Sequence, residues 1–66
     1  MSGLYAYRKG LEIEREGYPF DAIIQAAMRK ADSTNLVALR TAFPHEYADL
    51  RARYDAPGGL LEGETP

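Results

Sequence analysis

The apolar positions along the chain recur at intervals of three and four residues, the spacing of one face of an α-helix. The pattern is clearest after Pro19, where six apolar residues follow one another at helical steps: Phe20, Ile23, Ile24, Ala27, Met28 and Ala31. A weaker version occupies the start of the chain, at Leu4, Tyr7 and Leu11. The spacing predicts one helix over about 3–16 and a second, more apolar helix from Pro19 to about residue 31.

Prolines, glycines and capping residues divide this pattern into separate helices. Pro19 and Pro44 each stand where a helix can start, because the first turn leaves its amide hydrogens unpaired and the fixed φ of proline suits that position. Gly17 is a suitable left-handed terminator for the first helix, and Ser2 can cap its beginning. The residue before a proline avoids the α region, so we expect a third helix to end near Phe43.

A fourth helix is predicted to start at Pro44 and to carry Tyr47, Leu50 and Tyr54 on one face. The Ala56-Pro57-Gly58-Gly59 segment ends it. We therefore expect an all-α fold of three to four short helices that form a small bundle. Residues 1–56 are predicted to make a single helical domain, and residues 57–66 an acidic, mobile tail that begins with proline and glycine.

The small size of the chain predicts that it associates with something. A domain of 66 residues buries only about 60% of the surface that its unfolded chain exposes, so its stability is marginal. Disulfides, a structural metal or self-association usually supplement such a core, and the chain has no cysteine and a single histidine, His45. We expect homo-oligomerisation, or docking on a partner, to complete the fold.

Charge and hydropathy exclude several classes of partner. The formal net charge is −2, and the excess comes from Glu62 and Glu64 in the tail, because basic and acidic residues balance elsewhere. Without a strongly basic face, we expect no binding to duplex nucleic acid. No apolar run approaches the roughly 20 residues of a membrane span, and no signal-peptide core is evident, so we expect a soluble, cytoplasmic protein with no membrane partner.

Aromatic and basic residues are the candidates for ligand or partner contacts. The chain has five tyrosines and eight basic residues, which could stack a nucleobase and hold phosphates, or fill the core and subunit interfaces. The basic residues have carboxylates three or four positions away, so they could also be ordinary solvated faces. The candidate residues are Tyr5, Tyr18, Tyr47, Arg8, Lys9, Arg29, Lys30 and Arg51.

Two further features have alternative interpretations. Leu60 and Leu61 follow the sharp Gly58-Gly59 bend, and this apolar pair is expected either to fold back over the core or to hook onto a neighbouring subunit or a partner. Gly10, in the middle of the first helix, costs about 1 kcal/mol relative to alanine. It either allows a neighbouring helix to approach closely or is simply tolerated.

No pattern of catalytic or metal-binding residues is evident. His45 and Glu46 at the start of a helix are expected to be capping or surface residues, because no serine or cysteine nucleophile pattern accompanies them. Glu12, Glu14 and Glu16 alternate, so they cannot share one helix face and make a metal cage. The sequence therefore predicts a protein that is not an enzyme and that uses no cofactor and no metal.

Over about residues 18–61 the chain resembles small, uncharacterised helical proteins encoded by phages and prophages. The resemblance rests on Met28-Arg29-Lys30-Ala31-Asp32, Asn35-Leu36, Ala42-Phe43-Pro44 and Arg53-Tyr54-Asp55-Ala56-Pro57-Gly58-Gly59. Small phage proteins of this kind are often stoichiometric binders of host machinery, including inhibitors of immunity, and some helical oligomers sequester cyclic nucleotide signals. The resemblance thus implies a location in the cytoplasm of the host cell.

Three functional hypotheses follow. The leading one is a non-enzymatic accessory protein that binds a host protein and blocks it, as a form of counter-defence. An alternative is an oligomeric sponge in which basic and tyrosine side chains of adjacent subunits enclose a cyclic nucleotide signal. A third is a minor component of the virion or of the packaging machinery.

Overall fold

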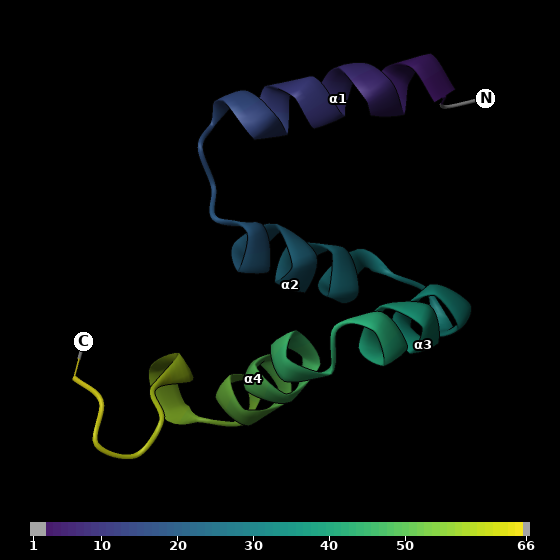
Figure 1. The fold of residues 1–66 in the computed structure, drawn as a ribbon. Helices are drawn as coiled ribbons and strands as arrows, with labels where there is room; N and C mark the ends of the chain where they lie inside the picture. The colour runs from purple at the N-terminus through teal and green to yellow at the C-terminus, as the bar shows by residue number, and fades with distance from the viewer. Residues whose placement is uncertain (1–2, 66) are drawn as a thin grey trace.

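A computed structural model describes residues 3–65 of the chain, so Ser2, the expected cap of the first helix, lies outside the described residues. Within them the protein is all-α, as predicted, and contains no strand (Figure 1). Its elements are α1 (Gly3–Arg15), α2 (Phe20–Lys30), α3 (Ser33–Ala42), α4 (Pro44–Tyr54) and a short 3-10 turn, η1 (Pro57–Gly59).

The helices begin and end where local sequence chemistry dictates. Gly17 follows α1 in the left-handed region, with φ of 74°, and Pro44 occupies the start of α4. Phe43 lies between α3 and α4 with φ of −130° and ψ of 66°, outside the helical region, as the following proline requires. Pro19 precedes α2 in an extended conformation, so this helix starts one residue later than the prediction.

The connection between α2 and α3 is made by two residues, Ala31 and Asp32. The carboxylate of Asp32 accepts a hydrogen bond from the backbone N–H of Asn35 at 2.8 Å. This satisfies one of the amide hydrogens that the first turn of α3 leaves unpaired. This short connection joins two helices that pack against each other.

Helices α2, α3 and α4 pack against one another, and η1 packs against α4. The core of this unit is small: Met28 on α2 and Leu50 on α4 are the buried apolar residues, with 3% and 7% of their surface exposed. Within the described residues, α1 packs against none of the other helices. Helix α1 lies apart from the other helices and runs antiparallel to α2 (Figure 1). The molecule is therefore elongated, with dimensions of 43 × 27 × 17 Å.

The apolar stripe of α2 is only partly covered by the other helices. Met28 is buried and Ile24 is half-buried, whereas Ala27 is exposed. Phe20 contacts the ring of Phe43 edge-on at a centroid distance of 5.6 Å, yet 62% of its surface remains exposed. The apolar residues of α2 therefore lie on two sides of the helix, and α3 and α4 cover one of them.

The small core predicts that single truncations within it are severe. We expect Leu50→Ala to lower the free energy of unfolding by about 2–5 kcal/mol, because it removes buried apolar contacts and leaves a cavity. Val37→Ala is the matched control: Val37 is 50% exposed on α3, and its truncation is expected to change stability by no more than about 0.5 kcal/mol. Urea denaturation followed by circular dichroism measures both, and equal effects would contradict this description of the core.

Candidate binding surface

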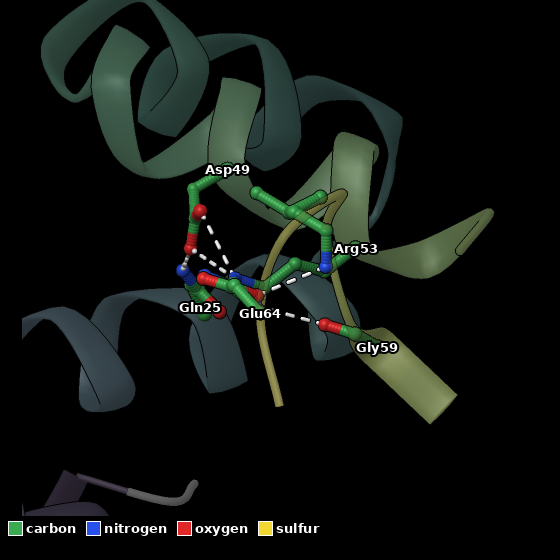
Figure 2. A network of polar contacts seen from close by, with 6 residues as sticks. Gln25, Asp49, Arg53, Gly59 and Glu64 are labelled. Atoms are coloured by element: carbon green, nitrogen blue, oxygen red, sulfur yellow. Dashed lines mark hydrogen bonds and ion pairs between the residues drawn. The ribbon is translucent and has the colours of Figure 1, made fainter. Parts of the chain in front are cut away.

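Arg53 on α4 holds the C-terminal segment in place (Figure 2). Its Nη1 and Nη2 donate to the two carboxylate oxygens of Glu64 at 2.7 and 2.8 Å, and Nη1 also donates to the backbone oxygen of Gly59 at 2.8 Å. One turn earlier on α4, Asp49 accepts from Arg53 Nε at 3.1 Å. The paired hydrogen bonds to Glu64 have the fork geometry that makes arginine–carboxylate contacts strong. One guanidinium therefore joins α4, η1 and the tail.

The same cluster also connects α4 to α2. Gln25 Nε2 donates to the second carboxylate oxygen of Asp49 at 3.0 Å (Figure 2). Within the tail, the backbone N–H of Leu61 donates to Glu64 at 2.9 Å. Both Leu60 and Leu61 are half-buried, so the apolar pair folds back on its own chain, the first of the two alternatives from the sequence. The segment predicted to be mobile has a defined anchor in Glu64.

An open apolar groove lies between the C-terminal end of α1 and one side of α2. Its volume is about 520 Å³. Of the described residues that line it, only Lys30 is charged, and the lining consists of Ile13, Tyr18, Ala22, Ile23, Ala26, Ala27 and Lys30. The floor is made mainly by alanines of α2, because these lie on the side of the helix that α3 and α4 leave open.

Exposed apolar side chains are concentrated in the N-terminal part of the described chain. Among residues 3–65, eight large apolar residues are more than two-fifths exposed, and six of them lie between residues 4 and 20: Leu4, Tyr5, Tyr7, Ile13, Tyr18 and Phe20. Single exposed apolar residues are normal on a protein surface, whereas a concentration of them marks an interaction site. The N-terminal part of the molecule, α1 with the connection to α2, is thus the candidate binding surface.

A second, smaller cleft lies among α2, α3 and α4. Its volume is about 160 Å³, and it is lined by Met28, Arg29, Leu36, Tyr47, Leu50, Arg51 and Tyr54. The Arg40 guanidinium lies 5.6 Å from the ring centre of Tyr47, and that of Arg51 lies 6.0 Å from the ring centre of Tyr54. Two tyrosine rings and three guanidinium groups therefore gather at one end of the helical unit.

The structure separates the candidate residues into three groups. Tyr5 and Tyr18 are 66% and 57% exposed, so both are available for contacts. Tyr47, Leu60 and Leu61 are half-buried within the packed unit. The basic candidates divide between surfaces: Arg8 and Lys9 stay on α1, Lys30 lines the groove, and Arg29 and Arg51 meet in the small cleft.

Several basic residues are occupied by contacts within the chain. Lys9 Nζ lies 3.2 Å from a carboxylate oxygen of Glu12 and 5.6 Å from the ring centre of Tyr5. Arg51 lies 3.8 Å from Asp55, one helical turn away. These pairs follow the spacing expected of solvated helix faces. By contrast, the Arg53–Glu64 contact joins residues that are eleven positions apart. The spacing of residues within one helix therefore cannot predict it.

Residues 3–65 contain no group of three or more histidine, cysteine, aspartate or glutamate side chains that could hold a metal ion. In the same part of the chain, no helix has the length and apolar character that crossing a membrane requires.

No protein-family model matches the chain, and no similar curated protein or solved structure was found. The resemblance of residues 18–61 to phage-encoded proteins stays a prediction.

The contact with Arg53 predicts an unusual acid titration. Hydrogen bonds from Arg53 and, second, from the Leu61 N–H lower the pKa of the Glu64 carboxyl from 4.5 to about 2. A lowered pKa in the folded state means that this contact stabilises the fold above about pH 4.5 and is lost as the pH falls towards 2. We expect the Glu64 side-chain carbon to titrate near pH 2 by NMR, with loss of the protected Leu61 amide over the same range.

Two variants serve as controls for this titration. Arg53→Ala is expected to return the midpoint of Glu64 towards 4.5, because it removes the main cause of the shift. Arg51→Ala, on the same helix, is expected to leave the midpoint unchanged. A Glu64 midpoint near 4.5 in the unmodified protein would show that the tail is not anchored in this way.

Proposed function

We propose that this chain is a non-enzymatic binding protein that acts by stoichiometric contact with a protein partner. The observation that carries the proposal is the concentration of exposed apolar side chains in the N-terminal part, in a molecule that buries only Met28 and Leu50 within its described residues. Surfaces of this kind exclude water when a partner covers them, and that burial supplies the affinity.

The character of the apolar groove favours binding over chemistry. Its lining is apolar apart from the Tyr18 hydroxyl and Lys30. A substrate pocket has several convergent polar groups that orient the reacting molecule, whereas an apolar groove receives a helix or a row of apolar side chains. The apolar lining of the groove therefore favours a surface on which another protein docks over an active site.

The identity of the partner follows from the resemblance to small phage-encoded proteins. Such proteins commonly bind host machinery one to one, so we propose that the partner is a host protein and that binding blocks it, as counter-defence. Tyr5, with Arg8 and Lys9 on the charged side of α1, supplies the kind of contact that dominates interface energies: an exposed aromatic ring beside basic groups.

An affinity experiment tests this function. The tagged full chain is used to capture proteins from host lysate, and the binding constant of a captured protein is then measured with purified components. We expect one partner per chain, and Tyr5→Ala to weaken its binding about tenfold or more, because truncating a central interface tyrosine commonly has this effect. Tyr54→Ala is the matched control, since Tyr54 is similarly exposed, at 71%, but lies on α4.

Either of two results would contradict the proposed function. If Tyr5→Ala and Tyr54→Ala weaken binding to the same small extent, α1 does not carry the partner contact. If no protein binds the chain at a fixed stoichiometry with purified components, the blocking role is wrong.

A second candidate function is supported by the small cleft. Arg29 and Arg51 meet there beside Tyr47 and Tyr54, which is the combination that holds a phosphate and stacks a base. Its volume of about 160 Å³ is below the roughly 300–1,000 Å³ of sites for drug-sized ligands. A whole cyclic dinucleotide does not fit a cleft of this size, so under this hypothesis a second subunit would have to supply the rest of the site.

Thermal unfolding distinguishes this candidate. A ligand that binds only the folded protein stabilises it, by about 2.7 kcal/mol when present at 100 times its dissociation constant. Under the sponge hypothesis, a cyclic dinucleotide raises the melting temperature by several degrees, and the double variant Arg29→Ala/Arg51→Ala loses this shift. Arg8→Ala, on α1, retains it. An unchanged melting temperature at saturating ligand removes the sponge from consideration.

A further inference from the structure

The chain exposes more surface than a compact protein of its mass. Its accessible surface is 5562 Å², whereas a compact monomer of 7.3 kDa exposes about 4,200 Å². Its radius of gyration is 13.9 Å, against about 11 Å for a compact domain of 66 residues. The excess of about 1,400 Å² per chain corresponds to about 2,800 Å² in a pair of chains, within the range of obligate homodimer interfaces.

Helix α1 is the main source of this excess. It has 13 residues and packs against no other helix among the described residues. An isolated helix of this length has only marginal stability in water. Lys9 and Glu12, which form an ion pair with each other, lie on one side. Leu4, Tyr7 and Leu11 lie on the other, at steps of three and four. We call these three residues the α1 ridge.

The groove has the complementary shape and composition. On α2, Ala22 and Ala26 are one turn apart and line the groove floor, so small side chains form a continuous track along the helix. Large side chains of one helix pack well into such a track, because ridges fit into grooves between rows of small residues. The protein thus carries both an uncovered ridge and an uncovered groove of matching character.

We propose that the groove is occupied by α1 of a second copy of this chain, so that the protein is a symmetric dimer. Each α1 lays its ridge over the groove of the other subunit, and the two contacts are identical by symmetry. Gly10 then has a role: a side chain at this position would meet nothing within its own chain, and its absence lets the partner helix approach closely. The charged side of α1, with Tyr5, stays on the outside of the dimer, so the proposed protein partner contacts this side of α1 and not the groove, which the second copy fills.

Two tyrosines of α1 provide a matched pair for the test. Tyr5 and Tyr7 are both 66% exposed, but only Tyr7 belongs to the α1 ridge. Sedimentation equilibrium of the purified full chain at about 100 µM is expected to give twice the 7.3 kDa mass of one chain. Tyr7→Glu is expected to give the mass of one chain, because the charge would be buried unpaired, and Tyr5→Glu to stay dimeric.

The groove is tested with a pair of alanines. Ala26 lines the groove, whereas Ala38 is exposed on α3 away from it. We expect Ala26→Glu to give monomers and Ala38→Glu to stay dimeric, with circular dichroism confirming that α2 to α4 remain folded in each variant. A dimer that Tyr7→Glu dissociates but Ala26→Glu does not would overturn the proposed pairing.

Two further results would also overturn it: a monomeric unmodified protein at this concentration, or equal masses for Tyr7→Glu and Tyr5→Glu. All these measurements use the purified chain alone, so they are independent of whether a host protein is captured. Loss of partner binding with an intact dimer would contradict the proposed function and leave the dimer standing.

Discussion

The packing of α2 against α4 is the contact on which the rest of the structure depends. Met28 and Leu50, one from each helix, are the residues it buries, and the link from Gln25 to Asp49 joins the same two helices. Helix α3 connects them and packs on both. Because so few side chains are buried, the α2–α4 contact has to be supplemented by polar contacts and, in our proposal, by a second chain.

Arg53 shows how a polar contact supplements a small core. It binds Asp49 on its own helix and Glu64 in the tail, so η1 and the half-buried Leu60 and Leu61 are held near α4. The energy of such partly exposed ion pairs is modest, but their geometry is specific. The tail therefore extends the packed unit without adding a helix.

The apolar residues of α2 are covered on one side of the helix and open on the other, and this difference connects the fold to its proposed functions. Helix α2 is apolar on two sides, and α3 and α4 cover only the side that carries Met28. A helix that is apolar around most of its circumference is normally buried. The open groove and the α1 ridge, in which Leu4 and Tyr7 are exposed and Leu11 is half-buried, thus point to association as the way this chain completes its core, whether with another copy or with a partner.

The sequence by itself determined the helices. The φ restriction imposed by Pro19 and Pro44, the left-handed Gly17 and the Asp32 cap act on neighbouring residues, so they can be read without knowledge of the fold. Only the tertiary structure decided which apolar faces are covered, that α1 stands apart, that Arg53 meets Glu64, and that Arg29 and Arg51 line one cleft. These contacts depend on the angles between helices, and residue spacing within one helix does not encode them.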